Sequence, residues 1–158
     1  DWTSEANVLQ INHAGRGVTP ADYDQDGDID VFVSNYRLDP NFFYDNQGDG
    51  TFRDIAGFNG TRGEQVAGAY GHTIGSVFGD VDNDGDLDLY MANNVRLENK
   101  LYVNDGTGNF TTSVDSVASG YDGYSHSSAW IDYDNDGDLD INSTHYMQTR
   151  DNQLFKNQ

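Results

Sequence analysis

Asp132–Asp140 reads Asp-Tyr-Asp-Asn-Asp-Gly-Asp-Leu-Asp, and the same pattern occurs at two earlier places in the chain. Asp22–Asp30 reads Asp-Tyr-Asp-Gln-Asp-Gly-Asp-Ile-Asp, and Asp80–Asp88 reads Asp-Val-Asp-Asn-Asp-Gly-Asp-Leu-Asp. Each copy has Asp at positions 1, 3, 5, 7 and 9, Gly at position 6 and an aliphatic residue at position 8. Two carboxylates about 4 Å apart repel each other by roughly 1 kcal/mol even in water, and by more when partly buried. This density of carboxylates therefore indicates a bound cation at each loop.

The cation that suits such a loop is Ca²⁺, because it takes several hard oxygen ligands and a glycine allows the sharp turn between them. We expect side-chain oxygens from positions 1, 3, 5 and 9 of each loop to bind. These residues are Asp22, Asp24, Asp26 and Asp30, then Asp80, Asp82, Asp84 and Asp88, then Asp132, Asp134, Asp136 and Asp140. Position 7 (Asp28, Asp86 and Asp138) is expected to contribute a backbone carbonyl, with its carboxylate available to cap backbone N–H groups. The position 8 residues Ile29, Leu87 and Leu139 are expected to point into the core.

Other readings of the loops fit less well. An EF-hand begins in the same way but needs a bidentate Glu at position 12 and flanking helices. Position 12 here is Val33, Met91 and Ser143, and the flanking residues favour strands. Zn²⁺ would require His or Cys, which the loops lack, and Mg²⁺ prefers fewer protein ligands. Metal-free acidic turns are the plain alternative, and the threefold recurrence of the same pattern argues against them.

The spacing of the loops predicts the fold. Asp22 and Asp80 are 58 residues apart, and Asp80 and Asp132 are 52 apart. Each loop is preceded by a short apolar run and followed by a strand-like one, at 29–35, 87–93 and 139–145. A second recurring motif follows, at 41–46, 99–104 and 152–157, and its Asn, Asp and Gly residues are typical of a tight hairpin. Four short antiparallel strands in roughly 50 residues is the size of a β-propeller blade, so the sequence predicts an all-β fold.

We expect one repeat domain, 1–158, with blades at about 16–58, 72–115 and 125–158. Only 94–100 has residues suited to a turn or two of helix. The third blade lacks its last strand, and three blades are too few for a closed ring. The chain begins with Asp, as a processed or cut piece would. Two hypotheses remain open: either further blades of a larger propeller are missing, or an N-terminal strand within 1–15 completes the third blade of another copy, giving a ring or a fibre.

Composition excludes several classes of function. The net charge is −19, with eight basic residues against 27 acidic ones, fifteen of which lie in the three loops. Such a chain has no basic face for nucleic acid and would be repelled by an anionic membrane surface. No run of residues is long and apolar enough to insert into a membrane. There is no cysteine, so bound metal rather than disulfides would crosslink the loops.

The repeats resemble the FG-GAP/VCBS family, which includes integrin α-subunit propellers, fungal propeller lectins and many secreted bacterial proteins. The residues that carry the resemblance are the three loops, Phe78-Gly79 before the second loop, and the tails Gly48-Asp49-Gly50-Thr51-Phe52 and Gly106-Thr107-Gly108-Asn109-Phe110. The resemblance implies a propeller whose Ca²⁺ loop joins the first two strands of each blade, in an extracellular setting. We expect a structural or adhesive role without catalysis, with self-association, further blades, extracellular proteins or glycans as partners.

A few other residues have competing interpretations. His72 and His126 precede the second and third loops and could act as general bases, but their recurrence favours hydrogen bonds between blades. Tyr121, Tyr124 and Tyr146 could form a sugar-stacking platform in a lectin-like module, although tyrosines between blades are the commoner use. Asn59, Asn109 and Asn142 fit the N-glycosylation sequon.

Overall fold

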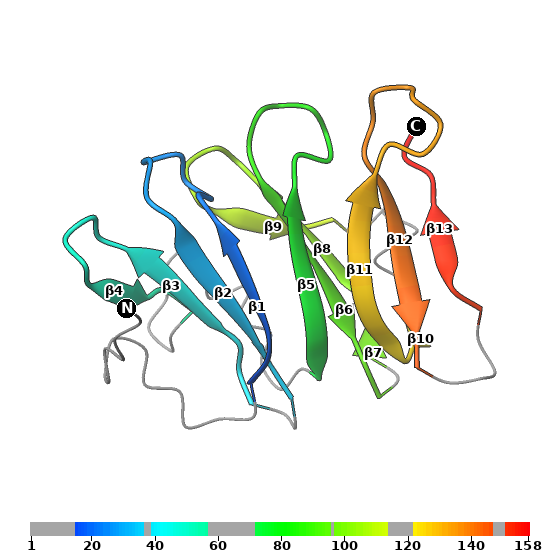
Figure 1. Ribbon diagram of the computed structural model, residues 1–158, viewed down its shortest axis with the longest axis horizontal. Coiled ribbons are helices and arrows are strands. Elements are labelled where there is room, and N and C mark those ends of the chain that lie inside the picture. The colour runs from blue at the N-terminus through cyan, green and yellow to red at the C-terminus, as the bar shows by residue number, and fades with distance from the viewer. Residues whose placement is uncertain (1–14, 37–38, 57–71, 96, 114–121, 147–150) are drawn as a thin grey trace, which may run out of the picture.

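The computed structural model describes residues 15–36, 39–56, 72–95, 97–113, 122–146 and 151–158. This part of the chain consists of short β-strands joined by turns and contains no helix (Figure 1). A helix that could cross a membrane is accordingly absent from these ranges. The expected all-β fold of antiparallel strands is confirmed. The interpretation of 94–100 as a helical turn is wrong, because a short strand begins at Leu97.

Three antiparallel sheets follow one another along the chain. The first has the order β1-β2-β3-β4, with β1 at Gly15–Ala21, β2 at Asp30–Asn35, β3 at Phe42–Asn46 and β4 at Phe52–Asp54. The second has the order β5-β6-β8-β9, with β5 at Thr73–Gly79, β6 at Asp88–Asn93, β8 at Lys100–Asn104 and β9 at Phe110–Thr112. The third has the order β11-β12-β13, with β11 at Ser125–Ile131, β12 at Asp140–His145 and β13 at Gln153–Phe155. A two-residue pairing joins β7 (Leu97–Glu98) to β10 (Asp122–Gly123).

Among the described residues the third sheet has three strands where the first two have four, as the sequence predicted. The segment proposed to supply a fourth strand, 1–15, lies almost entirely outside the described residues, which begin at Gly15. In each of the first two sheets the fourth strand follows a hairpin whose Asp side chain accepts hydrogen bonds from a Thr two residues later. The short last strand is therefore built by local turn chemistry.

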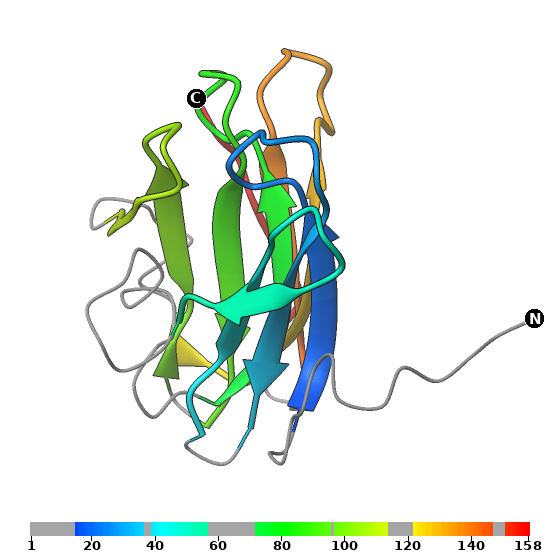
Figure 2. The same ribbon diagram turned by 90° about the vertical axis from the view of Figure 1, so that its left-hand side faces the viewer.

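The sheets lie side by side through their first strands, with β5 between β1 and β11 (Figure 1; Figure 2 gives the edge-on view). Small residues allow this approach. A Cβ on Gly75 would lie 3.0 Å from the carbonyl oxygen of His126. The Thr19 hydroxyl lies 2.7 Å from the Ser76 hydroxyl and donates to the Ser76 carbonyl at 3.1 Å. The inner strands therefore pack backbone against backbone, as small side chains permit.

Aromatic side chains fill the space between the sheets. Between the first two sheets the ring of Phe43 is fully buried, with its centroid 4.5 Å from that of Tyr23 and 6.0 Å from that of Phe110. Buried Tyr90, packed against Trp130, belongs to a second cluster that joins the second and third sheets. Aromatic rings supply the apolar area that a chain with 35% hydrophobic residues otherwise lacks.

The prediction that position 8 of each loop points into the core is wrong for Ile29, which is 54% exposed. Leu87 and Leu139 are only half-buried. Each second strand begins at position 9, where Asp30, Asp88 and Asp140 are all buried. Successive side chains of a strand face opposite sides, so an inward Asp at position 9 turns position 8 away from the core.

Candidate metal centres

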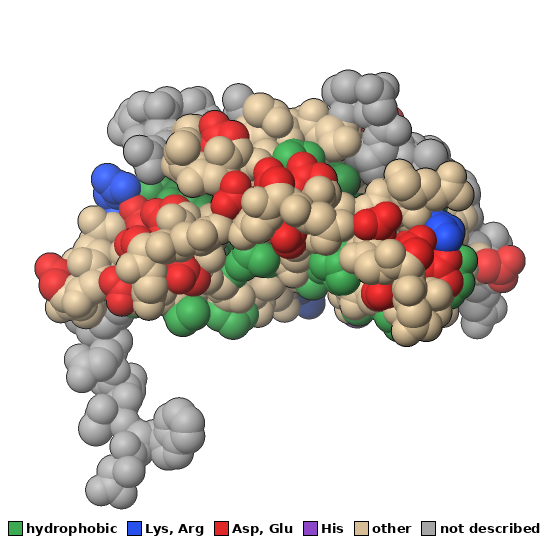
Figure 3. Space-filling model, turned by 90° about the horizontal axis from the view of Figure 1, so that it is seen from above, with side chains coloured by type: hydrophobic (Ala, Val, Ile, Leu, Met, Phe, Trp, Pro, Cys, Tyr) green, Lys and Arg blue, Asp and Glu red, His purple; other side chains and the backbone are tan. Residues whose placement is uncertain are grey.

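The three acidic loops lie together at one end of the molecule. Each connects the first two strands of its sheet, and the flanking residues are paired as Ala21 with Asp30, Gly79 with Asp88 and Ile131 with Asp140. Viewed from that end, acidic side chains gather over all three loops (Figure 3). The hairpin ends thus bring fifteen carboxylates from distant parts of the chain to one face.

Two left-handed residues in each loop determine the path of its backbone. The φ angles at position 4 are 59° for Gln25, 61° for Asn83 and 61° for Asn135. At position 6 the glycines have φ between 95° and 98°. Asn tolerates the left-handed region, whereas φ near 95° suits glycine because it has no Cβ. The glycine at position 6 is therefore needed for the curl of the loop.

Backbone N–H groups hold the carboxylates of positions 1 and 5 inside the curl. Asp80 accepts from the N–H of Asp84 and of Gly85, each at 3.1 Å, and Asp132 does the same with its own loop. In the first loop Asp22 accepts from Gly27 at 3.1 Å. The Asp at position 5 accepts from the N–H of position 7 in all three loops, at 2.9 to 3.1 Å. These hydrogen bonds orient the carboxylates without a bound cation.

In each loop three carboxylates converge. One oxygen from each of three Asp residues lies within 4.8 Å of the other two. The groups are Asp22, Asp24 and Asp26 in the first loop, Asp80, Asp82 and Asp88 in the second, and Asp132, Asp134 and Asp136 in the third. Of the positions expected to bind, 1 and 3 take part in every loop, position 5 in two and position 9 in one. Each group could hold a metal ion, and the assignment of individual ligands remains a prediction.

The carboxylate at position 9 joins the loop to the sheet. Asp88 is fully buried and accepts from the N–H of Val81 at 2.8 Å and of Asn104 at 2.9 Å. Asp30 and Asp140 each accept from the N–H of position 2 of their own loop. The second donor is the N–H of Asn46, at the end of β3, for Asp30 and the N–H of Asn157, two residues beyond β13, for Asp140. Burial raises the pKa of Asp30 and of Asp88 to about 6, although these backbone N–H groups lower it. Burial therefore makes the ionised forms of Asp30 and Asp88 less favourable than they would be in water.

Two asparagines in each repeat have structural roles that sequence reasoning missed. Asn41 and Asn99 are buried and accept from the N–H of the last residue of the second strand of their sheet, β2 or β6, at 2.8 and 2.9 Å. At the other end of the third strand, the Asn104 side chain donates to the carbonyl of Tyr23, at position 2 of the preceding acidic loop, at 2.8 Å. Asn157 donates to the carbonyl of Val81 in the same way, at 2.7 Å. The fixed spacing of the two asparagines was the available signal.

The loops also contact one another. Gln25 at position 4 of the first loop donates to the Oδ1 of Asp86 at 2.7 Å and to the carbonyl of Gly85 at 2.8 Å. Asn83 at position 4 of the second loop donates to the Oδ1 of Asp138 at 2.8 Å. The carboxylates at position 7 of the second and third loops therefore accept from a neighbouring side-chain amide. That these carboxylates also cap backbone N–H groups stays a prediction.

The first loop contains carboxylate oxygens that suit a cation. The Oδ1 atoms of Asp22 and Asp24 are buried and have no hydrogen-bond partner among the described residues. Burial raises the pKa of Asp24, and the neighbouring Asp26 and Asp45 raise it further. A buried acceptor without a donor costs about 1–3 kcal/mol, and more when it is charged. The donor set is all oxygen, as Ca²⁺ requires, so the residues present fit that ion.

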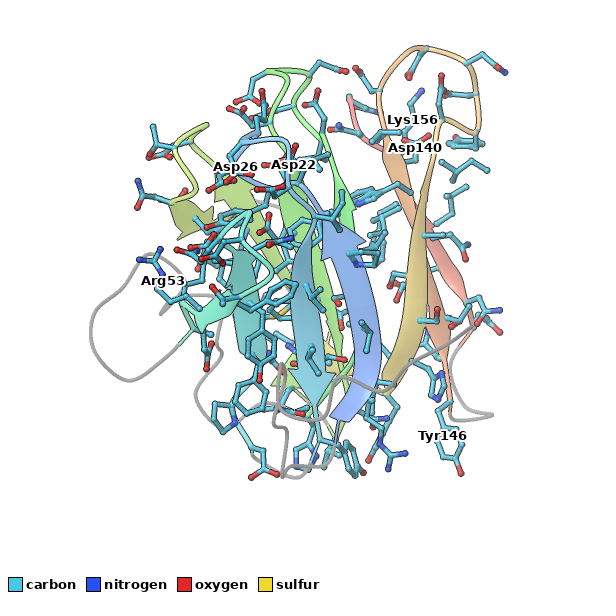
Figure 4. All side chains as sticks on the ribbon, turned by 60° about the vertical axis from the view of Figure 1, so that its left-hand side comes forward. Asp22, Asp26, Arg53, Asp140, Tyr146 and Lys156 are labelled. Carbon is cyan, nitrogen blue, oxygen red and sulfur yellow. The ribbon has the colours of Figure 1, made fainter. Side chains whose placement is uncertain are left out.

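The third loop pairs with a cationic side chain of the protein itself, that of Lys156. The Lys156 ammonium contacts the Oδ2 of Asp134 and lies 3.1 Å from the Oδ2 of Asp136. Figure 4 shows Lys156 at the loop end of the third sheet, near Asp140. Hydrogen bonds to the two carboxylates raise the pKa of Lys156, and one of them helps to lower that of Asp136. Sequence reasoning did not connect Lys156 with the loop.

Comparison with known proteins agrees with this geometry. The model of the FG-GAP-like repeat matches the chain twice, at residues 22–91 and 80–142. Together the two matches span well over half of the chain. This chain belongs to the FG-GAP-like repeat family. The resemblance seen in the sequence is confirmed, and both matches begin at position 1 of an acidic loop.

Two relatives of this FG-GAP-like chain carry the name Cartilage acidic protein 1. The human protein is 30% identical over 160 residues, a match that covers 99% of this chain and 23% of the relative. The mouse protein is 29% identical over the same length, covering 99% of this chain and 24% of the relative. This FG-GAP-like chain thus spans about a quarter of the length of the curated relatives it matches.

The aromatic and histidine candidates lie away from the FG-GAP-like loops. His72 packs its ring edge-on against Tyr36, with centroids 4.7 Å apart, and His126 stacks on Tyr146 at 6.3 Å. Tyr146 is 71% exposed, at the end of the sheet opposite the loops (Figure 4). Tyr124 is half-buried, and Tyr121 lies outside the described residues.

The raised pKa values of Asp30 and Asp88 predict how metal-free protein responds to pH. The folded state binds protons at about pH 6, whereas the unfolded carboxyl has a pKa near 3.8. The free energy of unfolding should therefore be larger near pH 4 and fall as the pH rises through about 6. Asp105, whose pKa Thr107 lowers to about 2, acts in the opposite direction only below about pH 4.

Thermal unfolding of protein freed of metal on a chelating resin, followed from about pH 4 to about pH 7, measures this trend. A melting temperature that rises across that range without added metal would contradict it. Excess divalent cation should reverse the slope, because the ion binds the ionised carboxylates.

Proposed function

We propose that this chain is a segment of a calcium-binding β-propeller that acts outside the cell in a structural or adhesive role, without catalysis. The observation that carries the proposal is the convergence of three carboxylates in each loop, with two buried oxygens in the first loop that lack a donor. The side-by-side packing of the sheets through their first strands supports the proposal that they are propeller blades. We assign these blades to about 16–58, 72–115 and 125–158.

Three Ca²⁺ ions are proposed, one for each loop. Each ion would be held by carboxylates of positions 1, 3, 5 and 9 and would neutralise their mutual repulsion. Sites of this kind in extracellular modules bind with dissociation constants of about 10⁻⁴–10⁻³ M, which suits a location outside the cell. The name of the two relatives associates them with cartilage and describes them as acidic. This chain is acidic too, with a net charge of −19.

Calcium should raise the melting temperature strongly. A site at 100 times its dissociation constant adds about 2.7 kcal/mol to the free energy of unfolding, so three sites should add roughly 10 °C or more in a chain of this size. Differential scanning calorimetry with excess Ca²⁺ and with EDTA measures the shift. An equal melting temperature in both conditions would overturn the proposal.

A matched pair of variants locates the effect. Asp82→Asn removes one carboxylate from the second loop, and Asp151→Asn removes the same charge from an exposed residue outside the loops. Without calcium, Asp82→Asn should be at least as stable as the parent because repulsion is relieved. With calcium, it should lose part of the stabilisation that Asp151→Asn retains. Equal responses of the two variants would count against binding at this loop.

We propose further that another strand completes the third sheet. β13 pairs with β12 at Ile141 to Phe155 and Ser143 to Gln153, and the described part of this sheet has no fourth strand. The fourth strand would come either from the remaining blades of a longer propeller or from residues 1–15 of a second copy. A sheet edge that accepts a strand from a neighbour gives a ring when the rotation closes and a fibre when it does not.

The size of the particle in calcium-containing buffer separates the two sources. Light scattering after size exclusion should show ring-sized or larger species if the chain donates its own N-terminal strand. Deletion of residues 1–14 should then return the chain to a monomer. A monomer at high concentration in both cases would rule out self-association and leave the longer propeller as the source.

A glycan-binding module is the alternative function. The observation that favours it is the exposed Tyr146 ring stacked on His126, since such rings can pack against a sugar. Binding on a glycan array that is lost in Tyr146→Ala, at unchanged melting temperature, would support it. Absence of glycan binding in calcium-containing buffer would exclude it for this chain.

A further inference from the structure

The three repeats differ in charge at one position beside the loops, the residue just before the second asparagine of each repeat. This residue is Asp45 in the first repeat, Val103 in the second and Lys156 in the third. Each directly precedes an asparagine whose N–H donates to the carboxylate at position 9 of its loop, at 2.8 to 2.9 Å. The three side chains therefore occupy equivalent places next to the three candidate metal centres.

Their effects on the loops differ in sign. Lys156 forms ion pairs with Asp134 and Asp136, which are positions 3 and 5 of the third loop. Asp45 adds negative charge near Asp24, although Arg53 partly offsets it with a hydrogen bond of 2.5 Å to the Asp45 Oδ2. Val103 carries no charge. The third loop is thus the one whose carboxylates already have a cation of the chain itself.

On the basis of the proposed function, we infer that Lys156 makes the third loop a weak calcium site that fills only when the ammonium is displaced. An ion entering this loop must break both contacts of Lys156 and then lies close to a positive charge. Charges a few ångströms apart near a protein surface interact strongly enough to change affinity by at least about tenfold. Among the described residues, no lysine or arginine pairs with a carboxylate of the first or second loop, so these loops bind first.

The inference also explains how the third unit holds its shape at low calcium. The ammonium relieves repulsion within the loop, as a bound ion does in the others. Both carboxylates and Lys156 are about one-third exposed, with side-chain exposures of 28%, 35% and 35%. Water can therefore reach the ammonium, and the long flexible side chain can swing out when an ion arrives.

Two reciprocal variants test the inference. Lys156→Val gives the third loop the residue of the second, and Val103→Lys gives the second loop the residue of the third. Lys100→Val is the matched control, because it removes the same charge from a lysine that pairs with Glu98, at 3.0 Å and outside the loops. Calorimetric titration of metal-free protein with Ca²⁺ gives the number and strength of the sites. The amide resonances of Gly27, Gly85 and Gly137 report which loop fills.

The parent chain and Lys100→Val should show two tight sites and one at least about tenfold weaker, with the Gly137 resonance moving last. Lys156→Val should bring the third site within a few-fold of the others. Val103→Lys should leave a single tight site, reported by Gly27. The result for Lys156→Val is sufficient if Val103→Lys does not fold.

Three sites of equal strength in the parent, or a third site that stays weak in Lys156→Val, would overturn this inference while leaving calcium binding intact. Absence of calcium binding in every variant would overturn the proposed function and this inference with it. The two failures are thus distinguishable.

Discussion

The structure depends on a buried carboxylate at the ninth position of each acidic loop. Asp30, Asp88 and Asp140 are each almost completely removed from water, and each accepts one N–H from the loop and one from the end of the third strand of its sheet or just beyond it. A buried charge is tolerated only when donors or a cation compensate its lost hydration. The same side chain therefore closes the loop, fixes the end of the third strand and adds to the negative potential of the candidate metal centre.

The sheets are held to one another by two kinds of contact. Small residues on β1, β5 and β11 let the first strands approach closely, and large aromatic rings such as Phe43 and Tyr90 fill the wider space behind them. The first strands also contribute rings of their own to these clusters, Phe78 from β5 and Trp130 from β11.

Much of the fold and of the candidate site could be predicted from the sequence, because it depends on local patterns of residues. The loops, the strands that follow them and the missing fourth strand of the third sheet all follow from residues close together in the chain. The direction of the Ile29 side chain, by contrast, could not be predicted from the sequence. A change of one residue in where a strand begins reverses which side chains point inward, and the hydrogen bonds to Asp30 that fix this start come from both sides of the loop. The contacts of Gln25 with Asp86 and of Lys156 with Asp134 join residues 61 and 22 apart, and no local pattern encodes them.

The contacts that join one acidic loop to the next have the same direction at both places where the structure describes them. The amide at position 4 of each of the first two loops donates to the carboxylate at position 7 of the loop that follows. The row of loops therefore has a head and a tail, like a polar filament. A unit inserted or exchanged within it would have to present an amide on one side and a carboxylate on the other. Shuffling of such units during evolution would thus be limited to pieces that keep the same orientation.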